Sequence, residues 1–179
     1  MLTELNDQSA VATTYTTPAG PFTVIAHDGI VLASGFTDDL DRLTVLIHPS
    51  MRPTEILHRD GAASALLRPV ADAVEAYFAG TVEAIDRVPV IQRSTAVRER
   101  GWDELRRIAP GEPISYGELA KRIDLPRGAR AAGQICARNA ASLFVPCHRV
   151  VASDGSPHHF GWGLPVKEWL LAHEYDHAA

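Results

Sequence analysis

The sequence predicts an α/β fold in which a sheet-and-helix N-terminal domain is followed by a mainly helical C-terminal domain. Two apolar, β-favouring runs lie within residues 20–36, on either side of Asp28-Gly29, a dipeptide typical of hairpin turns. From residue 96 onward, apolar residues recur at helical spacing between N-capping residues and Pro/Gly stops. The charge changes at about the same point, because residues 1–91 carry 5 Lys/Arg against 12 Asp/Glu and residues 92–179 carry 12 against 10. We therefore place the domain boundary between residues 91 and 92.

Length and composition restrict the class of protein. A chain of 179 residues suffices for one ordinary domain or two small ones that share a core. No run of 18 apolar residues is present, and the N-terminus lacks a basic segment followed by an apolar one. We therefore expect no membrane span, no secretion signal and a cytoplasmic location. The two cysteines, Cys136 and Cys147, cannot build a disulfide framework and are expected to be thiols.

The N-terminal half contains a tail, a hairpin, an ambiguous segment and a helix. Residues 1–12 are polar and unpatterned, so we expect a mobile tail before the hairpin. Residues 43–49 (LTVLIHP) are compatible with either a strand or a short helix. Residues 69–80 predict a helix with a proline at its start, a glycine as its stop, and Val70, Val74 and Tyr77 on one face. Residues 81–91 are predicted to be a linker.

The C-terminal half is predicted to contain a helix at residues 96–109, whose Trp102, Leu105 and Ile108 share one face. A second helix follows Ser115, a candidate N-cap with Glu118 three positions on, as in a capping box. The break LPRG separates it from a short, arginine-rich helix within residues 129–139. Two short helices across a tight turn indicate a helix-turn-helix, although many such hairpins bind nothing. A final helix with an apolar stripe closes the chain.

The segment VPCHRVV places Cys147 next to His148. Pro146 favours an extended conformation before it, and adjacent side chains of a regular strand point to opposite faces. The two side chains can therefore cooperate only if the chain turns there, or if a water or another group links them. A reactive thiol also needs a base or a helix N-terminus, and a carboxylate such as Glu174 would fix the tautomer of the histidine. From these residues alone, a buried and inert Cys147 remains an alternative.

Several separate motifs occur in a fixed order between residues 102 and 174, namely SYGELA, RAAG, VPCHRVV and FGWGLPVKEWLLAHE. Together they closely resemble the O6-alkylguanine-DNA alkyltransferases, also called methylated-DNA–protein-cysteine methyltransferases. TPAGPFTVIAHDGIVLASGF and AYFAG resemble that family's first domain more weakly. The resemblance implies an RNase H-like N-terminal domain and a winged-helix or helix-turn-helix C-terminal domain that carries the PCHR site.

The resemblance implies direct DNA repair in a single turnover. After nucleotide flipping, Cys147 would irreversibly accept the alkyl group from O6-alkylguanine, and from O4-alkylthymine, in double-stranded DNA. His148 would take the thiol proton through a bridging water, and Glu174 would orient His148. Tyr116 would assist proton transfer to the guanine, and Asn139 would join the recognition helix to the active-site loop.

The resemblance also implies minor-groove binding by a monomer, without cofactor or metal. Arg130 would be the finger that replaces the extruded nucleotide, and the small residues around it would permit close approach to DNA. The implied DNA contacts are Ser115, Ala129, Arg130, Ala131, Gly133, Gln134 and Arg138. The implied pocket residues are Ser142, Val150, Phe160, Gly161 and Trp162.

Departures from the family pattern leave the range of accepted alkyl groups open. Trp162 replaces a glycine, Phe160 a tyrosine, and Ser142 stands where many relatives have proline. The alternative function is an alkyltransferase-like lesion sensor without efficient repair, but such relatives lack the acceptor cysteine. A Cys-His hydrolase would not account for Arg130, and a transcription regulator would need a dimerisation segment.

Overall fold

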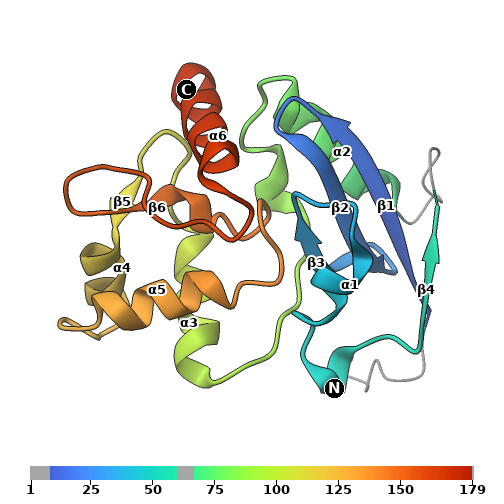
Figure 1. Ribbon diagram of the computed structural model, residues 1–179, viewed down its shortest axis with the longest axis horizontal. Coiled ribbons are helices and arrows are strands. Elements are labelled where there is room, and N and C mark those ends of the chain that lie inside the picture. Colours follow the sequence, from blue (N-terminus) through green and yellow to red (C-terminus); the bar gives the residue numbers. More distant parts are fainter. Residues whose placement is uncertain (1–8, 60–66, 179) are drawn as a thin grey trace.

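The computed structural model describes residues 9–59 and 67–178, in which a sheet domain lies beside a mainly helical domain (Figure 1). The sheet has the strand order β3-β2-β1-β4; β1 to β3 are antiparallel, whereas β4 is parallel to β1. Its β2–β3 turn places Asp28 and Gly29 at φ 47° and 79°, which confirms the predicted hairpin. The strands are β1 (Ser9–Thr17), β2 (Gly20–His27), β3 (Ile30–Gly35) and β4 (Glu55–His58).

Strand β1 was not anticipated. Residues 9–12 are its first residues and not part of a mobile tail, because Ala10 and Ala12 are fully buried in the sheet. Alanines and threonines dominate this strand, so its apolar pattern is weak in the sequence. Residues 1–8 of the expected tail lie outside the described part of the chain.

Helices cover the sheet. The ambiguous segment 43–49 begins inside α1 (Leu40–Thr44), where Leu43 packs into a cluster with Ala10, Ala12 and Ile25 of the sheet. Helix α2 (Arg68–Phe78) buries its predicted face, including Tyr77, and Gly80 follows it at φ 106°. The linker contains a 3-10 turn, η3 (Ala84–Arg87), and then pairs with β3 through a Val31–Val90 bridge.

The C-terminal domain follows the predicted helices closely. Trp102, Leu105 and Ile108 are buried, and Ser115 Oγ accepts a hydrogen bond from the Glu118 N–H at 3.1 Å, which confirms the N-cap. The elements are α3 (Ala96–Leu105), β5 (Ile114–Ser115), α4 (Tyr116–Arg122), α5 (Ala129–Ala137), the 3-10 turn η4 (Cys147–Arg149), β6 (Val150–Val151) and α6 (Leu164–His177).

The sheet domain holds the loop that leads to Cys147. Edge strand β3 pairs with this loop through Ser34, whose N–H donates to Ala140 O at 2.8 Å and whose O accepts from the Ser142 N–H at 3.1 Å. The Ser34 hydroxyl also donates to Ser142 O at 2.7 Å. One continuous core joins the two domains, with the Phe22 and Phe144 ring centroids 6.2 Å apart. The position of the loop therefore depends on the sheet.

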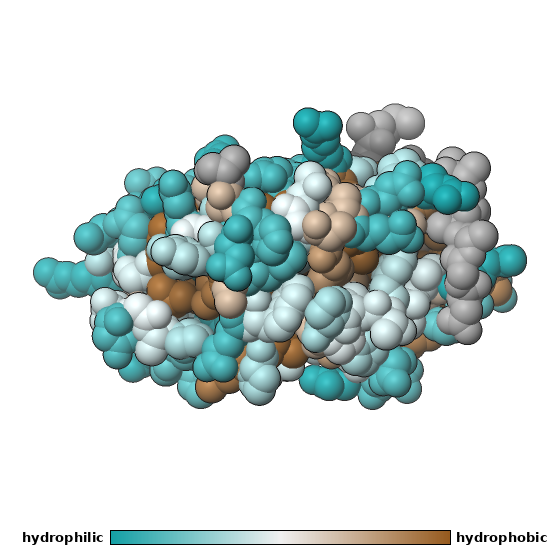
Figure 2. All heavy atoms as spheres, turned by 90° about the horizontal axis from the view of Figure 1, so that it is seen from above, coloured by the Kyte–Doolittle hydropathy of each residue, from teal (hydrophilic) through white to brown (hydrophobic). Residues whose placement is uncertain are grey.

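The molecular surface in the view of Figure 2 is mostly hydrophilic, with small, separate apolar patches. Within the described residues, no helix is long and apolar enough to cross a membrane.

Candidate active site

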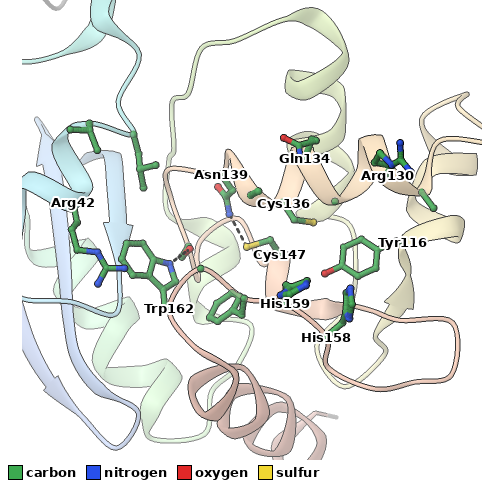
Figure 3. A pocket seen from close by; sticks show the side chains of 18 residues that line it. Arg42, Tyr116, Arg130, Gln134, Cys136, Asn139, Cys147, His158, His159 and Trp162 are labelled. Atoms are coloured by element: carbon green, nitrogen blue, oxygen red, sulfur yellow. Dashed lines mark hydrogen bonds between the residues drawn. The ribbon is translucent and has the colours of Figure 1, made fainter.

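A cavity of about 930 Å³ opens where α1, α5, η4 and residues 158–162 meet (Figure 3). Arg130 lies at one end of it, Arg42 and Trp162 lie at the other, and the Cys147 sulfur lies between them. The structure thus brings most of the predicted site residues into one cavity. The predicted residues that line it are Tyr116, Ala129, Arg130, Gly133, Gln134, Asn139, Ser142, Cys147, Phe160, Gly161 and Trp162.

Other predicted residues lie outside this lining. His148 and Glu174 are completely buried, and so is Val150. Ser115 caps α4. The remaining two lie on or just after α5: Ala131 is half-buried, and Arg138 is exposed.

Cys147 is the first residue of η4 and is only 6% exposed. The chain turns at Cys147 and His148, which is one of the conditions under which their two side chains could cooperate. Asn139 Nδ2 donates a hydrogen bond to Cys147 Sγ at 3.2 Å. Burial raises the pKa of the Cys147 thiol, although Asn139 and nearby Lys167 act in the opposite direction. The resting residue is therefore a thiol that must lose its proton to react, so the site needs a base.

His148 is a suitable base. Its Nε2 lies 2.8 Å from Glu174 Oε1, and its Nδ1 has no hydrogen-bond partner among the protein atoms described. Burial lowers the pKa of His148 below its ordinary value of 6.5, despite the opposing Glu174 carboxylate. The imidazole is therefore neutral near pH 7. Because the carboxylate can only accept, Nε2 carries the hydrogen and Nδ1 offers its lone pair to a proton.

The Glu174 carboxylate is the centre of a buried polar network. Arg149 Nε donates to Oε2 at 2.9 Å, while Arg149 Nη2 and the Tyr77 hydroxyl each donate to Oε1 at 2.9 Å. Burial alone would raise the pKa of Glu174, but His148 and Arg149 outweigh it and lower that pKa to about 2. Glu174 is therefore ionised and fixed in position behind His148.

Sequence reasoning missed the roles of Tyr77 and Arg149. Tyr77 was assigned only to the apolar face of α2, and its partner Glu174 lies 97 positions along the chain. No local pattern marks such a contact. Arg149 belongs to the PCHR motif, but its partners Glu174 and Ile108 lie 25 and 41 positions away in the sequence.

Lys167 was also missed. It is fully buried on α6, and its Nζ donates to Val150 O at 2.6 Å and lies 5.7 Å from the centroid of the Tyr116 ring. Burial lowers the pKa of Lys167, whereas negative charge on the nearby Cys147 or Cys136 sulfur favours its charged form. A positive charge here would stabilise a thiolate. Its spacing of three from Leu170 and seven from Glu174 places it on the buried face of the helix, which is the signal that could have revealed it.

Trp162 joins the two domains at the edge of the cavity. Its Nε1 donates to Ser142 Oγ at 2.7 Å, and the Arg42 guanidinium lies 5.1 Å from the centre of its ring. The indole lies so close to Gly35 that a Cβ there would be 2.2 Å from it. The two departures from the family pattern, Trp162 and Ser142, thus contact one another.

Among the residues that the structure describes, the ionisable side chains that line the cavity are basic, apart from two thiols and Tyr116. Arg42, Arg130, His158 and His159 line it, and no acidic residue is among the lining residues that the structure describes. His158 also lies edge-on to the Tyr116 ring, with 6.1 Å between centroids. A rim of this charge suits a polyanionic ligand.

Comparisons with known proteins agree on one family. A model described as "6-O-methylguanine DNA methyltransferase, DNA binding domain" matches residues 96–176. The methylated-DNA–protein-cysteine methyltransferase of Salmonella typhimurium is 32% identical over 161 residues, or 88% of this chain and 91% of that protein. The protein of the same name from Shigella flexneri is 38% identical over 105 residues, which span 59% of this chain and only 61% of that relative.

Solved structures match over nearly the whole chain. A crystal structure of Mycobacterium tuberculosis OGT in complex with DNA superposes with a TM-score of 0.77 and 30% sequence identity, covering 94% of each chain. A structure of the M. tuberculosis O6-methylguanine methyltransferase gives a TM-score of 0.76 at 29% identity, with 95% of each chain covered.

Proposed function

The chain belongs to the methylated-DNA–protein-cysteine methyltransferase family, and from this premise we propose that it repairs DNA by taking an alkyl group from O6-alkylguanine onto its own Cys147. One observation carries the assignment of the acceptor. Cys147 is the cavity thiol that receives the Asn139 N–H, and the next residue is a neutral histidine held by a buried carboxylate. This arrangement supplies a nucleophile, a base and an orienting group.

The proposed reaction is an in-line displacement. The thiol proton passes through a bridging water to His148 Nδ1, and the sulfur attacks the alkyl carbon. A C–S bond forms while the bond between that carbon and guanine O6 breaks, and the Tyr116 hydroxyl assists protonation of the departing guanine. Glu174 stabilises the imidazolium that forms on His148, as the carboxylate of a catalytic triad does. The thioether product is stable, so each molecule acts once.

Two groups favour the thiolate at the moment of attack. The Asn139 N–H donates to the sulfur, and Lys167 supplies a nearby positive charge. Hydrogen bonds to a charged form and opposite charges both lower a thiol pKa. They act against the burial that keeps Cys147 protonated at rest, although burial has the larger effect.

DNA would be bound through the minor groove by α5, with one protein molecule per lesion. Arg130 is exposed at the edge of the cavity, where its side chain can enter the base stack as the guanine leaves it. Small residues surround it, so the helix can approach the backbone closely. The basic rim supports this role, because flipping a nucleotide costs a few kcal/mol that phosphate contacts must offset. O4-alkylthymine is a second proposed substrate.

The domain assignments belong to the same proposal. We assign residues 1–91 to an RNase H-like domain and residues 92–179 to a winged-helix domain, in which α4 and α5 form the helix-turn-helix. The parallel pairing of β5 with β6 beside these helices supports the second assignment.

Mass spectrometry of the intact protein tests the function. After incubation with a duplex that contains O6-methylguanine, we expect one added methyl group per chain and no further turnover. Cys147→Ser should abolish the transfer, whereas Cys136→Ser, the matched change at the neighbouring thiol, should retain it. Binding to the duplex without any transfer would instead indicate a lesion sensor and would overturn the repair assignment.

A further inference from the structure

Gln92 lies at the junction between the two domains and holds the residue that contacts Cys147. Its Nε2 donates to Asn139 Oδ1 at 2.9 Å, and its Oε1 accepts from the Ala140 N–H at 2.7 Å. Both ends of one side-chain amide thus engage consecutive residues of the active-site loop. Because the Ala140 N–H can only donate, it requires the oxygen of Gln92, and the nitrogen of Gln92 must then face Asn139.

The Asn139 amide is itself fully hydrogen-bonded. Its Oδ1 accepts from Gln92 and from the Ala141 N–H at 3.1 Å. Its Nδ2 donates to Val145 O at 2.7 Å and to Cys147 Sγ at 3.2 Å. An amide has two N–H donors and an oxygen that accepts two hydrogen bonds, so every site is used in this orientation.

Reversing the Asn139 amide would exchange its oxygen and nitrogen with little change in shape. Nδ2 would then face the N–H groups of Gln92 and Ala141, and Oδ1 would face the Val145 carbonyl and the sulfur. Of the groups that oppose this reversal, Gln92 is the side chain that lies outside the loop. It is therefore the group that a substitution can change without altering the loop or the cavity lining.

We propose that Gln92 is a positioning residue for alkyl transfer, because it keeps the N–H of Asn139, and not its oxygen, directed at the Cys147 sulfur. This inference rests on the proposed function. It makes the junction between the domains a determinant of thiolate formation, although Gln92 itself contacts neither the sulfur nor the cavity.

Other ionisable groups also face Cys147. They come from several elements, namely Tyr116 from α4, Cys136 from α5 and Lys167 from α6, while His148 follows Cys147 within η4. None of their side chains hydrogen-bonds to Gln92 in the described part of the chain. A change at position 92 therefore reaches the thiol through Asn139.

The test is a titration of the Cys147 thiol in the full-length protein, made in a Cys136→Ser background so that one cysteine remains. Reaction with iodoacetamide is followed as a function of pH, without DNA. Gln92→Glu keeps the acceptor for Ala140 but places a second carboxylate oxygen against Asn139 Oδ1, which favours the reversed amide. We expect the pH midpoint of the Cys147 reaction to rise by about one unit, because the thiolate loses the hydrogen bond that Asn139 donates to it. Gln92→Leu should raise it by less.

Arg93→Leu is the matched control, because Arg93 follows Gln92 in the junction and no hydrogen bond or ion pair involves its side chain in the described chain. Its midpoint should equal that of the background protein. An unchanged midpoint in Gln92→Glu, with the protein still folded by circular dichroism, would overturn the proposal. So would slower methyl transfer without a shifted midpoint, because that result indicates a structural role alone. If the parent protein accepts no methyl group from DNA, the proposed function fails, but the titration still tests Gln92.

Discussion

The sheet domain and the helical domain contribute to the site in different ways. The proposed acceptor thiol, the proposed base and its carboxylate all lie in the helical domain, on η4 and α6. The sheet domain supplies groups that hold them: Tyr77 donates to Glu174, and Ser34 pairs with the loop before Cys147. The sheet domain therefore positions the site, because its contacts end on the carboxylate behind the proposed base and on the loop that precedes Cys147. The following substitutions test that division.

The largest effect is expected at the centre of the helical domain. Glu174→Gln removes the charge that faces Arg149 and His148 and leaves the buried guanidinium without its carboxylate. Breaking a buried ion pair from one side costs about 3–5 kcal/mol. We expect a loss of this size in the free energy of unfolding, measured by urea denaturation, together with loss of methyl transfer. A stability within about 1 kcal/mol of the parent would show that the network is not essential to the fold.

A smaller effect is expected at the contact between the domains. Gly35→Ala adds a Cβ that would meet the Trp162 ring at 2.2 Å, so the indole must move, and we expect its hydrogen bond to Ser142 to weaken. Overpacking of this kind costs about 1–3 kcal/mol. Urea denaturation would measure the loss, and indole fluorescence would report the displacement of Trp162.

Gly133→Ala is the control for this substitution, because, apart from the neighbouring backbone of its own helix, no atom lies within 4 Å of the position that its Cβ would occupy. Its stability should equal that of the parent or exceed it, since alanine favours a helix more than glycine does. Equal stability of Gly35→Ala and the parent would mean that the indole is not held against the sheet.

The smallest effect tests the contribution of the sheet domain to the proposed base. Tyr77→Phe keeps the ring in the core but removes one hydrogen bond to Glu174. Hydrogen bonds to charged groups contribute about 1.5–3 kcal/mol to the free energy of unfolding. Because His148 and Arg149 still donate to Glu174 in this variant, we expect a loss at the lower end of that range. We expect slower methyl transfer in a single-turnover assay, with a smaller loss of stability than in Glu174→Gln. A transfer rate equal to that of the parent would show that Tyr77 contributes to packing but not to the proposed reaction.

The sequence predicted the helical domain better than the sheet domain. Caps and breaks such as Ser115 and LPRG act locally, so the helices lie where their signals predicted them. Strand β1 was missed because its buried residues are small, and β4 because it is only four residues long. The motifs also predicted which residues gather around Cys147, since most of those residues line one cavity.

What the sequence did not reveal depends on the approach of distant segments. Tyr77 and Gln92 have no distinguishing local pattern, and they meet their partners 97 and 47 positions away. Trp162 was identified as a departure from the family, but its contact with Gly35 depends on how the two domains pack. Such contacts follow from the tertiary structure and not from periodicity.

The pH dependence of methyl transfer, followed by mapping of the methylated peptide, tests the account most directly. Burial lowers the pKa of His148 below the ordinary histidine value of 6.5. The imidazole therefore stays neutral, and able to accept a proton, at pH values somewhat below 6.5. The rate should therefore fall on the acidic side only at a pH below 6.5, and His148→Ala should remove this fall along with most of the rate. The methyl group should be found on Cys147 alone. A methyl group on another residue, or a parent rate that His148→Ala leaves unchanged, would contradict the assignment of Cys147 and His148.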